Sequence, residues 1–132
     1  VASPNLVIAN SIYNGGYAAI GGRSYLIEGV LYVTAVVGGG LKFDLGASTA
    51  TFGNFVLEAD FTSAAAIASV QVASATSVAG ATGLWLKSRF TATVDCTNSG
   101  SVGLRYAQNA AAAGVTLLQG SWMRVTEIPL SN

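Results

Sequence analysis

The chain has 132 residues, of which only 9% are charged, compared with about 25% in an average soluble domain. Six Lys and Arg residues balance six Asp and Glu residues, and this balance argues against nucleic-acid binding, which needs clustered basic side chains. No uninterrupted apolar run approaches the roughly 18 residues of a membrane helix, and Cys96 is the only cysteine, so no disulfide can form within the chain.

Short strands separated by turns are expected along most of the chain, since Gly, Ser, Thr, Val, Tyr and Phe dominate its middle. The expected strands cover residues 5–9, 17–20, 24–35, 41–45, 52–61, 66–73, 84–95, 102–108, 115–118 and 121–128. Asn14-Gly15-Gly16 and Asn98-Ser99-Gly100 supply turns, and residues 74–83 form a connection of small residues. About eight to ten strands at this spacing indicate an all-β sandwich or barrel, in a single domain covering residues 1–132.

Segment 24–35 is the longest expected strand, and both of its faces are largely apolar. One face carries Tyr25, Ile27, Leu31 and Val33, and the other carries Leu26, Glu28, Val30, Tyr32 and Thr34. Such a pattern is typical of a strand that is covered on both sides. Because a nearly neutral, apolar monomer would be poorly soluble, we expect the second side to be buried against copies of the same chain.

Three other segments alternate strictly between apolar and polar residues. Segment 41–45 places Leu41, Phe43 and Leu45 on one face; segment 52–61 places Phe55, Leu57, Ala59 and Phe61 together; segment 121–128 sets Met123 and Val125 opposite Trp122, Arg124 and Thr126. This alternation is typical of antiparallel strands with one wet face. It predicts that Phe43, Phe55 and Phe61 lie in the core.

The residues that most catalytic and metal sites require are scarce. Histidine is absent, so no Ser-His-Asp triad, His-based metal site or imidazole base can form. Cys96 is expected to be a small buried residue, since a thiol nucleophile needs a base. Gly38-Gly39-Gly40 lacks the flanking residues of a phosphate-binding loop. We therefore expect no enzymatic activity, no cofactor and no metal.

Glu58 and Asp60 form the one carboxylate pair to consider, because they share a face of the expected strand 52–61. Two such carboxylates could serve as an acid–base pair or as calcium ligands. The simpler interpretation is a solvated strand face, paired across strands with Lys42 or with Lys87 and Arg89.

Three aromatic residues are the candidates for ligand binding. Tyr13 and Tyr17 flank the Asn14-Gly15-Gly16 turn, and Trp85 follows a segment of small residues. Exposed Tyr and Trp side chains could stack on sugars. The alternative is that these side chains fill the core or a subunit contact.

Four residues are the candidates for a subunit interface: Tyr32, Arg105, Tyr106 and Arg124. Both arginines have apolar neighbours in their expected strands. They could pair with Glu127, Asp95 or Glu28 inside a subunit contact. The alternative is that they lie on the surface and extend toward solvent.

The end of the chain resembles a family of viral structural domains. The sequence Gly-Leu-Arg-Tyr-Ala-Gln-Asn at residues 103–109, a loop of small residues, and Leu-Gln-Gly-Ser-Trp-Met-Arg-Val-Thr-Glu-Ile at residues 118–128 are similar to the closing strands of C-terminal head domains in phage tail-fibre and minor virion proteins. Residues 24–29 resemble the early long strand of those domains. The resemblance implies an antiparallel jelly-roll β-sandwich of the tumour-necrosis-factor-like type, assembled as a homotrimer.

The function that follows from the resemblance and the composition is a non-enzymatic virion structural or receptor-recognition domain at the virion surface. Its expected partners are copies of itself, other virion proteins and a host surface glycan or protein, with no nucleic acid and no membrane. Two alternatives remain: a carbohydrate-binding module of a secreted protein, and a pilin or adhesin subunit.

Overall fold

The computed structural model describes residues 7–8, 17–35, 41–45, 49–63, 67–72, 78–79, 85–107 and 115–128. In these ranges every regular element is a strand, and every strand pairs antiparallel with its neighbours. The prediction of an all-β fold with antiparallel sheets is therefore confirmed. No helix of the described residues is long and apolar enough to cross a membrane.

The strands are β1 (Val7–Ile8), β2 (Tyr17–Ala19), β3 (Ser24–Ala35), β4 (Lys42–Asp44), β5 (Thr51–Ser63), β6 (Ile67–Val72), β7 (Val78–Ala79), β8 (Trp85–Asn98), β9 (Gly100–Val102), β10 (Arg105–Ala107), β11 (Val115–Leu117) and β12 (Trp122–Ile128). The larger sheet has the order β11-β3-β8-β5-β6, and β12 also pairs with β3. The smaller sheet has the order β1-β10-β4-β7, and β2 and β9 form a separate pair.

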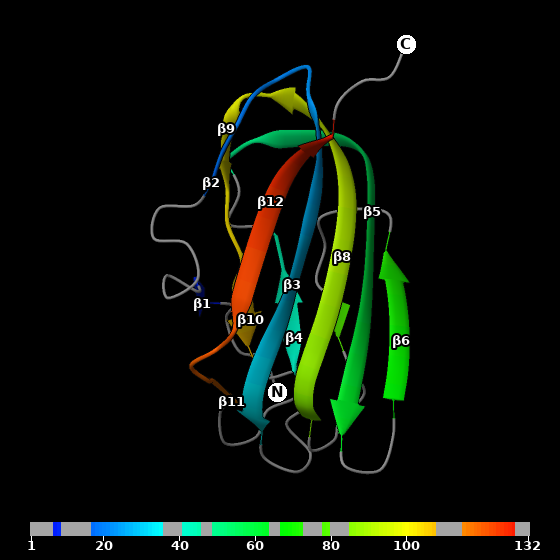
Figure 1. Cartoon of the computed structure of the whole chain (residues 1–132), viewed down its shortest axis with the longest axis vertical. Coiled ribbons are helices and arrows are strands. Elements are labelled where there is room, and N and C mark those ends of the chain that lie inside the picture. The colour runs from blue at the N-terminus through cyan, green and yellow to red at the C-terminus, as the bar shows by residue number, and fades with distance from the viewer. Residues whose placement is uncertain are drawn as a thin grey trace, which may run out of the picture.

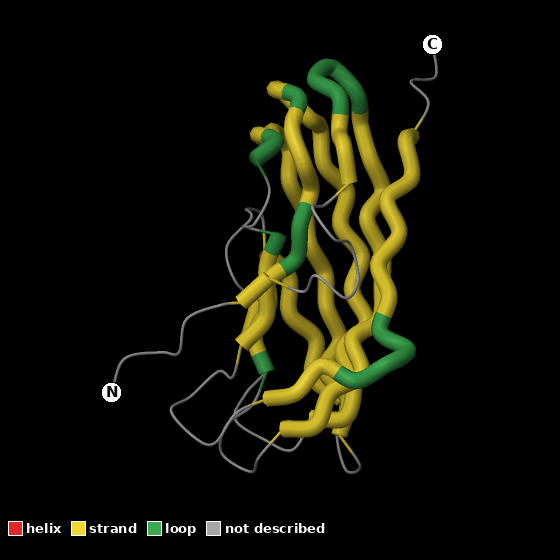
Figure 2. Tube along the Cα trace, turned by 90° about the vertical axis from the view of Figure 1, so that its left-hand side faces the viewer, coloured by secondary structure: helices red, strands yellow, loops and turns green. Residues whose placement is uncertain are grey.

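The two main sheets lie in separate layers, as in a β-sandwich (Figure 1). Seen from the side, the smaller sheet lies against one face of the larger sheet only (Figure 2). Among the described elements, none covers the opposite face of β12, β3, β8 and β5. We call this outward surface the open face.

Aromatic rings fill the space between the two layers. The ring of Phe43 on β4 lies 5.1 Å from the ring of Phe90 on β8 and 5.9 Å from that of Phe61 on β5, measured between centroids. These three side chains are fully buried, and Phe55 is buried beside them. Burying one such ring stabilises a fold by roughly 1.5–3 kcal/mol. The prediction that Phe43, Phe55 and Phe61 form core is confirmed.

A β-bulge in β5 places two aromatic rings on the same side of the strand. Phe52 and Phe55 are three positions apart, so strict alternation would turn one of them outward. The pairing with β8 is irregular between Gly53 and Val56, and Asn54 there has a positive φ of 44°. The bulge inserts an extra residue, and Asn tolerates this conformation better than most residues. As a result both rings reach the core, 5.9 Å apart.

Two segments differ from the sequence-based prediction. Segment 102–108, expected as one strand, is divided at Gly103 and Leu104, because the chain there passes from β9, which pairs with β2, to β10 in the smaller sheet. Segment 74–83, expected as a connection, contains β7, which extends the smaller sheet beside β4. With these short elements the described part of the chain has twelve strands, above the expected eight to ten.

The strand β3 has the expected bounds but not the expected surroundings. Its inward residues Tyr25, Ile27, Leu31 and Val33 are all buried, as predicted. On the other side Val30 is buried, whereas Tyr32 and Thr34 are exposed. Within the described part of a single chain, β3 is therefore covered on one side only. Its covering by sister subunits stays a prediction.

Candidate binding surface

The pairing register decides which side chains lie on the open face, because residues directly opposite each other in antiparallel strands point to the same side. Three rows of side chains cross β12, β3, β8 and β5 in that order. They are Thr126, Leu26, Thr93 and Val56; Arg124, Glu28, Thr91 and Glu58; and Trp122, Val30, Arg89 and Asp60. Hydroxyl, charged and apolar groups thus lie side by side on one surface.

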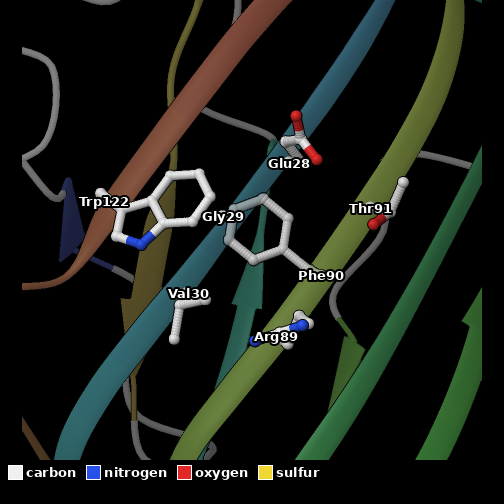
Figure 3. A pocket seen from close by; sticks show the side chains of 7 residues that line it. All are labelled: Glu28, Gly29, Val30, Arg89, Phe90, Thr91 and Trp122. Atoms are coloured by element: carbon white, nitrogen blue, oxygen red, sulfur yellow. The ribbon is translucent and has the colours of Figure 1, made fainter.

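A depression of about 260 Å³ lies on the open face, between the last two of these rows. Its lining residues are Glu28, Gly29, Val30, Arg89, Phe90, Thr91 and Trp122. Figure 3 shows the indole of Trp122 extending from β12 toward β3, with Arg89 and Thr91 on β8 across from it. The site therefore combines an aromatic ring with a guanidinium, a carboxylate and a hydroxyl group, supplied by three strands.

The backbone of Gly29 lines the depression, and a side chain at this position would point to the core side of the sheet, as Phe90 does. A Cβ atom at this position would lie 2.8 Å from the Phe90 ring and would also collide with the backbone oxygen of Trp122. Phe90 is opposite Gly29 in the β3–β8 register, and its ring is buried against the β3 backbone. The absence of a side chain at Gly29 therefore allows the Phe90 ring to pack against β3.

Arg124 connects two walls of the depression without lining it. Its Nε donates a hydrogen bond to Oε1 of Glu28 at 3.0 Å, and its Nη2 donates to the same oxygen. The guanidinium carbon also lies 6.0 Å from the centroid of the Trp122 ring, within the range of a cation–π interaction. The predicted pairing of Arg124 with Glu28 is confirmed, within one chain.

The charges around the depression balance. Arg124 neutralises Glu28, and Arg89 lies opposite Asp60 in the β5–β8 register. The placement of Asp60 beside Arg89 on an exposed strand face supports the simpler interpretation of the Glu58 and Asp60 pair. Within the described ranges, no three acidic, His or Cys side chains are close enough to hold a metal ion.

Of the three candidate ligand-binding residues, only Tyr17 has a described side chain. Tyr13 lies outside the described residues, and so does the side chain of Trp85. Tyr17 on β2 is half-buried and makes an edge-to-face contact with Tyr25, with ring centroids 6.0 Å apart. Its ring therefore belongs to the margin of the core.

The four candidate interface residues fall on different surfaces. Tyr32 and Arg124 lie on the open face, whereas Arg105 is on β10 in the smaller sheet. Tyr106 is half-buried against the core, opposite Phe43.

Arg105 has a different partner from those predicted, because β10 pairs with β4 and places Asp44 directly opposite. Nε and Nη2 of Arg105 donate to the two carboxylate oxygens at 2.9 and 2.8 Å. These hydrogen bonds raise the pKa of Arg105 above its ordinary value. Of the predicted partners, Glu127 instead pairs with Arg23, and Asp95 accepts hydrogen bonds from Ser24 and Asn54.

A second feature, which we call the apolar corner, lies where β11 turns into β12. It consists of Tyr32 and Leu118, each about 40% exposed. The turn is fastened to β3: Leu118 N donates to Tyr32 O at 2.7 Å, and Tyr32 N donates to Ser121 Oγ at 2.9 Å. Gly120 completes it with a φ of 96°, a conformation that favours glycine. A hollow of about 280 Å³ lies along residues 117–121.

Cys96 is buried, as predicted. Burial raises the pKa of its thiol above 9.0, and Sγ donates to the backbone oxygen of Asn98 at 3.2 Å. The thiol therefore remains protonated near neutral pH and plays no part in the depression or the apolar corner.

No protein-family model, curated protein or solved structure matches this chain. The functional proposal therefore depends on the geometry above and on the resemblance of its closing strands.

Proposed function

We propose that this chain is a non-enzymatic structural and receptor-recognition domain of a virion surface, folded as a jelly-roll β-sandwich and working as a homotrimer with other virion proteins as its further partners. The resemblance of residues 103–109 and 118–128 to head domains of phage fibres supports the virion assignment. The antiparallel two-layer architecture is compatible with it.

The observation that carries the assembly proposal is the apolar corner. Tyr32 on β3 and Leu118 on the turn after β11 expose large apolar surfaces, and hydrogen bonds hold the two segments together. The energetic centre of a protein interface is depleted of charge and rich in aromatic anchors that fill pockets. The corner supplies an aromatic and an aliphatic side chain, and no charged residue of the described ranges lines the neighbouring hollow. The rest of the open face carries Glu, Asp and Arg side chains among its apolar residues.

We therefore propose that the subunits meet at the apolar corner rather than over the whole open face. Burying the charged row of Arg124, Glu28 and Glu58 would cost several kcal/mol per ion unless each charge found a partner in the sister subunit. Burying Tyr32 and Leu118 carries no such penalty. The middle of the open face is left accessible.

The experiment is to remove the apolar corner and measure mass in solution. The double variant Tyr32→Ser/Leu118→Ser should sediment as a 13.3 kDa monomer at a micromolar concentration at which the unchanged chain is a trimer. Val56→Ser is the matched control, because Val56 is an exposed apolar residue of the open face on β5, away from the corner. A double variant that remains a trimer would place the contact elsewhere.

A further inference from the structure

We infer that the depression beside Trp122 binds one neutral pyranose ring of a glycan. The inference deepens the recognition role proposed above and rests on it, since it names the class of receptor that the domain contacts.

The size of the depression limits its occupant to a single ring. Its volume is about 260 Å³, slightly below the ~300–1,000 Å³ of sites that enclose drug-sized ligands. The site is open to solvent along the sheet, so the remainder of a longer chain of sugars can extend outside the depression.

Trp122 provides the surface on which a sugar ring stacks. The indole is 42% exposed and lies beside the depression (Figure 3). A pyranose has an apolar C–H face that matches an aromatic plane, and Trp offers the largest such plane at a small cost in conformational entropy. Arg124 lies close to the same ring, so the indole is oriented before a ligand arrives, which reduces the entropy lost on binding.

The polar side chains of the depression suit vicinal hydroxyl groups. Glu28 uses Oε1 for Arg124, and among the described residues its Oε2 accepts no hydrogen bond, so this oxygen can accept from a sugar hydroxyl. Arg89 forms none of the ion pairs that occur within the described ranges, and its guanidinium offers a planar set of donors. Thr91 adds a hydroxyl that donates or accepts.

The balance of charge selects a neutral sugar over an acidic one. The two arginines near the depression are matched by Glu28, which lines it, and by Asp60, which lies opposite Arg89. A carboxylate, sulfate or phosphate on the ligand would approach Glu28 and be repelled, with no surplus positive charge to compensate. Hydroxyl groups interact with both donors and acceptors without this penalty.

The test uses the unmodified trimer and four methyl pyranosides, those of glucose, galactose, mannose and N-acetylglucosamine, at millimolar concentration. Saturation-transfer NMR should detect binding of at least one of them, with chemical-shift changes at the Trp122 indole and on β3 and β8. Trp122→Ala should weaken this binding by at least about tenfold, the loss typical of a central aromatic anchor. Thr93→Ala, an exposed residue of β8 that does not line the depression, is the control and should bind as the unchanged chain does.

Three binding results would each overturn the assignment. They are binding to none of the four glycosides by a folded trimer, binding that Trp122→Ala leaves unchanged, and tighter binding of methyl glucuronide than of methyl glucoside. Sedimentation of the same samples separates this inference from the assembly proposal. If Trp122→Ala becomes monomeric, the depression receives a sister subunit and the sugar assignment fails, whereas a trimer that binds no sugar leaves assembly intact.

Discussion

Removing Arg105 should destabilise the smaller sheet, because its partner Asp44 would keep a buried negative charge. The Asp44 side chain is only 3% exposed, and Arg105 contacts both of its carboxylate oxygens. Removing one partner of a fully buried ion pair lowers the free energy of unfolding by about 3–5 kcal/mol. Since the Arg105 side chain is 34% exposed, solvent screens part of this interaction, and we expect Arg105→Met to lower the free energy of unfolding by about 2–3 kcal/mol.

The measurement is urea unfolding followed by tryptophan fluorescence, at one protein concentration for all variants because assembly contributes to apparent stability. The companion variant Arg105→Met/Asp44→Asn removes the charge as well as its partner. It should recover part of the loss, since an amide is less costly to bury than a carboxylate that has lost its guanidinium partner. A loss below roughly 0.5 kcal/mol, the level of an exposed ion pair, or no recovery in the double variant, would refute the reasoning.

Three further changes test other parts of the structure. Gly29→Ala should lower the free energy of unfolding by about 1–3 kcal/mol through overpacking, because the new Cβ would collide with Phe90. Gly53→Ala should be tolerated in the same unfolding assay, because its Cβ would meet its nearest neighbour at 3.6 Å. Hydrogen bonds from Ser24 and Asn54 hold the pKa of Asp95 below its ordinary value. The carboxylate therefore stabilises the fold at neutral pH and loses this effect as the pH falls through the lowered pKa, so in thermal melts Ser24→Ala should be more destabilising at about pH 6 than at about pH 2. Cys96 should react with iodoacetamide at about pH 8 only when the chain is unfolded, because burial raises the pKa of its thiol and blocks access of the reagent. Rapid alkylation of the native protein would contradict the placement of Cys96 in the core.

The parts of the fold that depend on local alternation could be predicted from the sequence. Met123 and Val125 face inward with Trp122 and Arg124 outward, as their spacing indicates. The observed bounds of β3 also match the predicted ones, because Gly21-Gly22 before it and glycines after it interrupt the strand pattern. These features need only the two-residue period of a strand.

The features that depend on long-range pairing could not be predicted. The bond from Arg105 to Asp44 requires that β10 lies beside β4, and the spacing of neither strand contains that information. Phe52 could be placed in the core only with knowledge of the bulge at Asn54.

The depression was missed for the same reason. Trp122, Glu28 and Arg89 come from three strands that are far apart in the sequence, and each one alone resembles an ordinary outward residue. Their outward positions on alternating strands were the available signal. The register that brings them together from two neighbouring rows of side chains was not available.

Sedimentation equilibrium of the unmodified chain at micromolar concentration tests the assembly proposal most directly. We predict a single species of about 40 kDa, three times the chain mass of 13.3 kDa. A stable 13.3 kDa species across the same concentrations would contradict the proposal that copies of this chain meet at the apolar corner.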